Sequence, residues 1–160
     1  MIKRDHIRTV ISLRGGSPSD DWYREEIAVC QTENVTHREV PFSARSLPSP
    51  SALEKLLDVF DHATYPILLH CQAGADRTGL ASTIYAHLYQ KLPLSQAEAT
   101  ELTWRYGHFP VDKTRAMDEF FALYNKDAAG MNLREWILKR YPKIYSDSSS
   151  AHSANAAQTN

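Results

Sequence analysis

"LLHCQAGADRTGLAS", residues 68–82, sets a single cysteine between an apolar stretch and a stretch that favours a helix. The residues before Cys71 are apolar over 66–70, which predicts a strand of the kind that lies at the centre of a sheet, covered on both faces. From Thr78 onward, large apolar residues recur every four positions, which predicts a buried helix. Cys71 is therefore predicted to begin a loop that joins a strand to a helix.

The rest of the chain alternates between strand and helix patterns in its first half and is helical in its second half. Strands are predicted at 7–13, 35–42 and 66–70, and helices at 22–34, 50–60, 78–90, 95–107, 112–125 and 132–141. The helix from 95 is predicted to open with a capping box, and Gly107 to end it. This order predicts an α/β fold with a small, mostly parallel central sheet flanked by helices and a helical C-terminal half.

The composition is that of one soluble domain. Of the 160 residues 42% are hydrophobic and the formal net charge is −1, which excludes the basic excess typical of nucleic-acid-binding proteins. No run is long enough to cross a bilayer, and we expect a cytoplasmic protein. We predict a domain over 1–145 and a disordered tail over 146–160, because the tail contains no large apolar residue. The oligomeric state is left open.

The two cysteines do not form a recognisable framework. Cys30 and Cys71 are far apart and lie in no metal-ligand spacing, so the sequence predicts neither a structural metal nor a disulfide scaffold, and no cofactor. Cys30 falls in a predicted amphipathic helix and is interpreted as a core residue. Cys71 needs an explanation of its own.

The loop after Cys71 is built to hold an anion. A loop between the carboxyl end of a strand and the start of a helix collects unpaired N–H groups, and Gly74 tolerates the dihedral angles that such a turn requires. Arg77 can contribute a bidentate guanidinium. The predicted phosphate-binding loop is Gln72, Ala73, Gly74, Ala75, Asp76 and Arg77.

The same surroundings favour a reactive cysteine. A thiol near a helix N-terminus and a guanidinium has a pKa lowered from about 8.5 to roughly 3.5–7.5, so Cys71 is expected to be a thiolate at neutral pH. A thiolate below a bound phosphoryl group can attack phosphorus and form a phosphocysteine intermediate that water then hydrolyses. This chemistry requires no metal.

The segment HCQAGADRTG, residues 70–79, resembles the His-Cys-x5-Arg-Ser/Thr signature of the cysteine-dependent protein tyrosine and dual-specificity phosphatases in their compact bacterial form. IRTVISLRG, YGHF, DEFFALY and EWILKRY resemble flanking parts of the same group, so that the likeness covers most of 1–145. The resemblance implies that Cys71 is the nucleophile, that Arg77 binds phosphate, and that Thr78 hydrogen-bonds the sulfur. It implies that His70 orients the loop and helps to lower the pKa of the thiol, and a purely structural histidine is the alternative. It leaves open whether the natural chain extends further at its N-terminus.

The position of the predicted general acid differs from the one that is usual in that family. FSARSLPSPS, where the aspartate of most members would lie, contains no acidic residue. Asp76, beside Arg77, resembles the Asp-Arg pair of some phosphoinositide and bacterial phosphatases, and we predict it to be the general acid. A helix cap or an ion pair with a neighbouring arginine is the alternative role for Asp76. Arg45 and His108 are interpreted as solvated surface residues, with a place at the rim of the pocket as the alternative.

The resemblance thus predicts a phosphomonoester hydrolase whose partner is a phosphorylated protein or a small phosphomonoester. A phosphoinositide or inositol phosphate phosphatase with the same mechanism is an alternative, although the uncharged Ala73 and Ala75 disfavour highly phosphorylated inositols. A rhodanese-like sulfurtransferase or an arsenate reductase fits the Asp-Arg-Thr-Gly segment less well. A non-catalytic phosphate-binding module is the alternative from another class.

Overall fold

The computed structural model describes residues 2–108 and 115–148 of the chain. Their sheet has three parallel strands, β1 (Thr9–Ser12), β2 (Thr36–Glu39) and β3 (Ile67–His70), in the order β2-β1-β3. In the register, Thr9 lies opposite both Thr36 and Ile67, so the three carboxyl ends meet at one edge of the sheet. The predicted α/β class with a small parallel sheet is confirmed.

The position of one strand differs from the prediction. β1 is the central strand and is buried throughout, whereas β3 pairs only with β1 among the described residues and its four residues are half-buried. The prediction that 66–70 forms the central strand is therefore wrong. Its apolar side chains instead serve an edge strand, where Ile67 and Leu69 pack against the main core and Leu68 against a smaller cluster on the other face.

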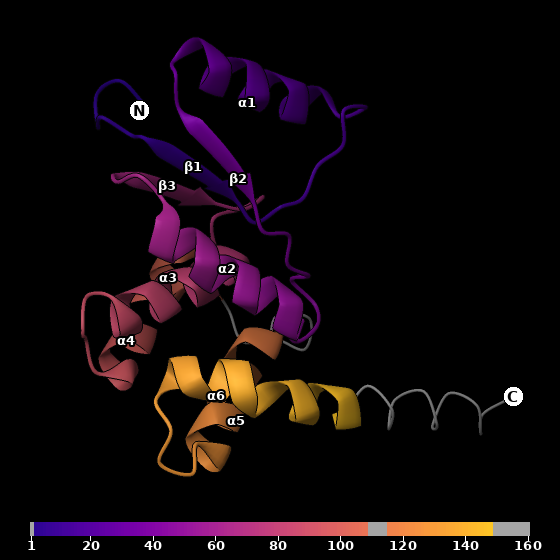
Figure 1. Ribbon diagram of the computed structural model, residues 1–160, viewed down its shortest axis with the longest axis vertical. Coiled ribbons are helices and arrows are strands. Elements are labelled where there is room, and N and C mark those ends of the chain that lie inside the picture. The colour runs from indigo at the N-terminus through magenta and orange to yellow at the C-terminus, as the bar shows by residue number, and fades with distance from the viewer. Residues whose placement is uncertain (1, 109–114, 149–160) are drawn as a thin grey trace, which may run out of the picture.

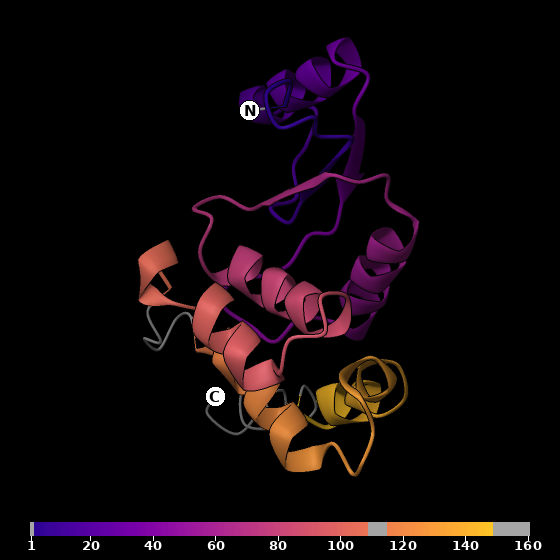
Figure 2. The ribbon, with the colours of Figure 1, turned by 90° about the vertical axis from the view of Figure 1, so that its left-hand side faces the viewer.

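Helices lie on both faces of the sheet. The elements are α1 (Asp21–Thr32), α2 (Pro50–His62), α3 (Asp76–Leu88), α4 (Leu94–Glu101), η1 (Trp104–Tyr106), α5 (Ala116–Asp127) and α6 (Leu133–Lys139). Figures 1 and 2 show α1 alone on one side of the sheet, with α2, α3 and the later helices on the other. The loop that follows β3 therefore enters the helical half of the molecule.

Local signals explain where several helices begin. The Ser49 hydroxyl accepts a hydrogen bond from the N–H of Ala52, and the Asn132 side chain accepts one from the N–H of Glu135. The predicted capping box at 95 is wrong, because α4 begins at Leu94 after Pro93 and has no side-chain cap. Gly107 ends the short η1 turn rather than a long helix, with a φ of 80°.

The main core joins the sheet to the helical half. Its aromatic centre is formed by Phe120, Trp136 and Tyr141, whose rings contact one another, and the Tyr141 hydroxyl donates a 2.7 Å hydrogen bond to the Pro48 carbonyl. Residues 141–148 are also helical, so helical structure continues past the predicted boundary at 145 into the first three residues of the predicted tail. The rest of that tail, 149–160, lies outside the described residues. None of the described helices has both the length and the apolar character needed to cross a membrane.

Candidate active site

The predicted loop lies where β3 ends, and the next helix begins at Asp76. Gly74 has a φ of 72°, in the left-handed region that favours glycine, as the sequence predicted. Gly79, one turn into α3, is a packing requirement: a Cβ there would lie 2.7 Å from Leu102 Cδ1 and 3.0 Å from the Glu101 carbonyl oxygen. The first turn of α3 is therefore held tightly against the end of α4.

Cys71 is partly buried at the start of this loop, as a free thiol. Burial by itself raises the pKa of the thiol, but hydrogen bonds from surrounding donors outweigh it, and the pKa of Cys71 is lowered below its ordinary value. The donors are the Thr78 side chain and the backbone N–H groups of Ala73, Gly74 and Thr78. The loop thus stabilises negative charge at the sulfur, and the same N–H groups can serve an anion.

Arg77 and Thr78 hold buried donors that the described residues do not fully satisfy. The Arg77 Nε is buried without a partner, and its NH1 makes only a 3.5 Å contact with the Leu13 carbonyl. The Thr78 hydroxyl is buried without a well-aligned hydrogen bond, and the group on which it acts is the adjacent Cys71 sulfur. A buried guanidinium N–H is costly unless it is paired, and a phosphoryl group offers the oxygen acceptors that Arg77 needs.

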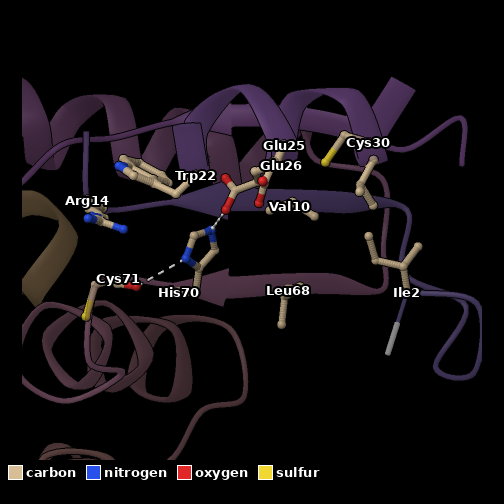
Figure 3. Close-up of a pocket in the computed structure, with 11 residues that line it drawn as sticks. Ile2, Val10, Arg14, Trp22, Glu25, Glu26, Cys30, Leu68, His70 and Cys71 are labelled. Carbon is tan, nitrogen blue, oxygen red and sulfur yellow. Dashed lines mark hydrogen bonds and ion pairs between the residues drawn. The ribbon is translucent and has the colours of Figure 1, made fainter. Parts of the chain in front are cut away.

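His70 connects the loop to α1. Its Nδ1 donates to the Cys71 carbonyl at 3.2 Å, and its Nε2 lies 3.0 Å from Glu26 Oε2, an ion-pair distance without hydrogen-bond alignment. The other carboxylate oxygen of Glu26 accepts from His37 Nε2 at 2.7 Å. In Figure 3 the His70 ring points toward Glu26, whereas the Cys71 sulfur points away from it. His70 therefore orients the main chain of Cys71, and no local pattern in the sequence identified Glu26 as its partner.

Asp76 is held by a residue that the sequence analysis placed at the surface. His108 is buried, with 3% of its surface exposed, and its Nδ1 lies 2.7 Å from Asp76 Oδ1. The other ring nitrogen, Nε2, lies 3.0 Å from Asp118 Oδ2. The prediction of a solvated His108 is therefore wrong, because two carboxylates satisfy its ring, whereas Arg45 is exposed as predicted. Asp76 makes neither a cap nor an arginine pair among the described residues, since the N-cap position of α3 is Ala75.

A pocket of about 450 Å³ lies between α1 and the sheet and reaches Cys71 at one end. Arg14, Trp22 and His70 line one end of it, where the Arg14 guanidinium lies 3.8 Å from the centre of the Trp22 ring. Cys30 lines the opposite end from Cys71 (Figure 3) and is buried, with 2% of its surface exposed, which agrees with its interpretation as a core residue. Among the described residues, no group of three or more histidine, cysteine or acidic side chains is arranged to hold a metal ion.

Part of the chain matches a known protein family. Residues 1–89 match the model of a family described as a polymorphic toxin system DSP-PTPase phosphatase (Tc-R-P). No curated protein sequence matches the chain. The matched residues include the whole of the loop from Cys71 to Thr78 and end before His108 and Asp118.

Solved phosphatase structures share the fold. Tk-PTP, in a mutant form, has a TM-score of 0.57 at 20% identity over 79% of this chain and 81% of its own. A putative phosphatase from Shewanella putrefaciens CN-32 has a TM-score of 0.57 at 17% identity, over 79% of this chain and 75% of its own. TpbA from P. aeruginosa, as a cysteine-to-serine variant in complex with phosphotyrosine, has a TM-score of 0.56 at 20% identity, over 81% and 78%.

Proposed function

Because the chain belongs to the DSP-PTPase phosphatase family of polymorphic toxin systems and is a cysteine-dependent phosphatase of the protein tyrosine phosphatase type, we propose that it hydrolyses phosphotyrosine through a phosphocysteine on Cys71. The observation that carries the proposal is the free, partly buried Cys71 thiol at the start of a loop that contains a left-handed Gly74 and the buried, unpartnered Nε of Arg77. The lowered pKa of the thiol, caused by hydrogen bonds from Thr78 and the loop N–H groups, agrees with this arrangement. A thiolate cradled by such donors is an activated nucleophile that faces the position of an anion.

The first half-reaction transfers the phosphoryl group to the enzyme. The Cys71 sulfur attacks phosphorus while the bond from phosphorus to the leaving oxygen breaks. Arg77 binds two phosphoryl oxygens and stabilises the charge that develops on them. Asp76, in its protonated form, gives its proton to the leaving oxygen and becomes a carboxylate.

The second half-reaction restores the enzyme. Water attacks the phosphorus of the phosphocysteine and gives a proton to the Asp76 carboxylate, while the bond from sulfur to phosphorus breaks. The Thr78 hydroxyl stabilises the departing thiolate, and inorganic phosphate leaves. Each group returns to its starting protonation state, so the cycle consumes only the phosphomonoester and water.

A structural relative and the uncharged loop residues support phosphotyrosine as the substrate class. A structural relative, TpbA, is described in complex with phosphotyrosine. The loop positions Ala73 and Ala75 carry no positive charge, which disfavours a polyphosphorylated inositol ring. We therefore rank a phosphotyrosine peptide above a phosphothreonine peptide and a phosphoinositide.

The test is phosphate release, in the presence of EDTA, from a phosphotyrosine peptide, a phosphothreonine peptide and a short-chain phosphoinositide. We expect the wild type to prefer phosphotyrosine, Cys71→Ser to be inactive, and the matched variant Cys30→Ala to remain active. Preference for the phosphoinositide would overturn the substrate class alone. If neither the wild type nor Cys71→Ser releases phosphate from any substrate, the chain is a phosphate-binding module and the hydrolase proposal fails.

A further inference from the structure

His108 is a buried histidine for which the mechanism above has no role. It follows the η1 turn and lies between the first residue of α3 and the first turn of α5, with hydrogen-bond distances of 2.7 Å to Asp76 Oδ1 and 3.0 Å to Asp118 Oδ2. Both ring nitrogens are therefore engaged by carboxylates. Burying a polar ring is costly unless it is satisfied in this way, so the arrangement fixes the ring in one orientation.

The backbone around His108 is fixed as well. Its N–H donates to the Thr103 carbonyl at 3.2 Å, and the preceding Gly107 adopts a left-handed φ of 80°. A Cβ at Gly107 would lie 3.7 Å from Ala75 Cβ, within ordinary contact of the phosphate-binding loop. The turn at 107–108 is therefore docked against the loop, and the His108 ring cannot swing away without breaking several contacts.

The contact leaves the two oxygens of Asp76 in different situations. Oδ1 is taken by His108, whereas no described residue provides a hydrogen bond to Oδ2. The side chain of Asp76 retains 19% exposure, so it is neither sealed in the core nor free in solvent. A carboxyl group anchored by one oxygen presents the other in a defined direction.

We propose that His108 is a positioning residue that anchors Asp76 through Oδ1 so that Oδ2 can exchange a proton with substrate and water, and that Asp118 in turn holds the His108 ring. This inference rests on the proposed function, in which Asp76 is the general acid. In the first half-reaction the proton moves from Asp76 Oδ2 to the leaving oxygen, and the resulting carboxylate accepts the His108 Nδ1–H at Oδ1. In the second, a proton from water returns to Oδ2, while the contact between His108 Nδ1 and Oδ1 is kept.

Carboxylates face both nitrogens of the His108 ring. Asp118 lies in the first turn of α5, where the helix dipole stabilises an anion. Glu98 on α4 faces Asp118, and burial together with the Asp118 charge raises the pKa of Glu98, which His87 on α3 partly offsets. Among the described residues, the side-chain partners of both ring nitrogens of His108 are therefore carboxylates.

A pair of amide variants separates the two contacts of His108. In His108→Asn the amide nitrogen reaches roughly the position of Nδ1 and can still donate to Asp76, whereas in His108→Gln it reaches the position of Nε2 and contacts Asp118 instead. Both variants keep a polar group in the buried site, so that each serves as the folding control for the other. His62→Asn, at an exposed position at the end of α2, is the control for loss of a histidine elsewhere.

The measurement is kcat/KM with two leaving groups, a phosphotyrosine peptide and p-nitrophenyl phosphate. A general acid matters most for the poorer leaving group, the tyrosine phenol, whereas nitrophenolate leaves without much help. Asp76→Asn is expected to lower kcat/KM for the peptide by about 10²-fold, in the lower part of the range for general acid catalysis, with a much smaller loss for p-nitrophenyl phosphate. His108→Gln is expected to show the same selective loss, about tenfold, and His108→Asn to restore kcat/KM to within about threefold of the wild type.

The outcomes are distinguishable. If Asp76→Asn shows the selective loss and His108→Gln does not, the positioning role is overturned while the proposed mechanism stands. Equal losses on both substrates in both His108 variants, with weaker inhibition by vanadate, would show that His108 merely maintains the loop, and would also overturn it. If Asp76→Asn shows no selective loss, Asp76 is not the general acid and the inference falls with that part of the proposed function. Only variants that elute at the same volume as the wild type and melt at the same temperature are compared.

Discussion

Two groups of histidines and carboxylates flank the loop at 71–77, which we propose to bind phosphate, and they are built in opposite ways. On the sheet side, one carboxylate, Glu26, is shared by His37 and His70. On the helical side, one histidine, His108, is shared by Asp76 and Asp118. The first group ends on the main-chain carbonyl of Cys71, whereas the second includes Asp76, which we propose as the general acid.

The difference separates two ways of supporting catalysis. A group that holds the backbone of the loop acts on the sulfur and the phosphoryl site, and therefore affects every substrate to the same extent. A group that holds a proton donor affects only the step in which the leaving oxygen needs a proton. The leaving-group dependence of kcat/KM is thus the property that distinguishes the sheet side from the helical side, and the following changes test it.

The largest effect is expected at Arg77, which lies between the two groups. Arg77→Lys keeps the positive charge but removes the bidentate fork, so we expect kcat/KM to fall by about 10²–10³-fold, the range for loss of a transition-state donor. The loss should be equal for the phosphotyrosine peptide and p-nitrophenyl phosphate. A loss confined to the peptide would place Arg77 with the helical group and break the comparison. Arg45→Lys, at an exposed position, is the matched control.

The next largest loss of activity is expected at Thr78, whose hydroxyl acts on the Cys71 sulfur. Thr78→Val removes the hydroxyl that helps to lower the pKa of Cys71, while Thr78→Ser retains it. For a hydrogen bond to a charged group worth about 1.5 kcal/mol, kcat should fall about tenfold in Thr78→Val. Because iodoacetamide reacts with the thiolate, the midpoint of the pH dependence of its reaction with Cys71 should move to higher pH in Thr78→Val and stay in place in Thr78→Ser. An unmoved midpoint in Thr78→Val would contradict the assigned role.

Glu26 tests the sheet side directly. Glu26→Gln removes the charge that faces His70 and His37, and we expect kcat/KM to fall about three- to fivefold, as for a hydrogen bond with a net contribution of about 1 kcal/mol. The fall should be the same for both leaving groups, in contrast to His108→Gln. The neighbouring Glu25→Gln is the matched control, measured in the same assay. A selective loss on the peptide would show that the two sides of the loop are not separable.

The smallest effect is expected away from the loop, at the ion pair between Asp61 on α2 and Arg134 on α6. The Arg134 guanidinium holds the pKa of Asp61 at about 2, below its ordinary 3.8. Since this pKa is lowered on folding, its contribution to stability is fully present above pH 3.8 and is lost as the pH falls toward about 2. We expect Asp61→Asn to lower the free energy of unfolding by about 0.5–1 kcal/mol at pH 7, because the pair is partly exposed and screened.

Urea titrations at several pH values measure this contribution. The difference between the wild type and Asp61→Asn should shrink as the pH falls from about 4, and kcat/KM per folded molecule should be unchanged for both leaving groups. Asp58→Asn, an exposed carboxylate on the same helix, is the control. A selective change in leaving-group dependence in Asp61→Asn would mean that the helical half affects Asp76 through its packing as well as through His108.

The part of the site that could be predicted is the part that is contiguous in the chain. Cys71, Gly74, Arg77 and Thr78 lie within one turn of loop and helix, so their spacing alone constrains their geometry. The parallel sheet could also be predicted, from the alternation of apolar strands with amphipathic helices. The order of the strands could not be predicted, because an apolar run at 66–70 is equally suited to a central strand and to an edge strand that packs against helices on one face.

The sequence by itself determined the position of the loop after β3, the cysteine at its start and the family of the chain, since all of these depend on residues a few positions apart. Only the tertiary structure decided what holds the loop in place. Glu26 lies 44 positions from His70, and His108 lies 32 positions from Asp76, and no pattern along the chain connects residues so far apart. Their contacts exist because α1 packs on one face of the sheet and the η1 turn docks against the start of α3.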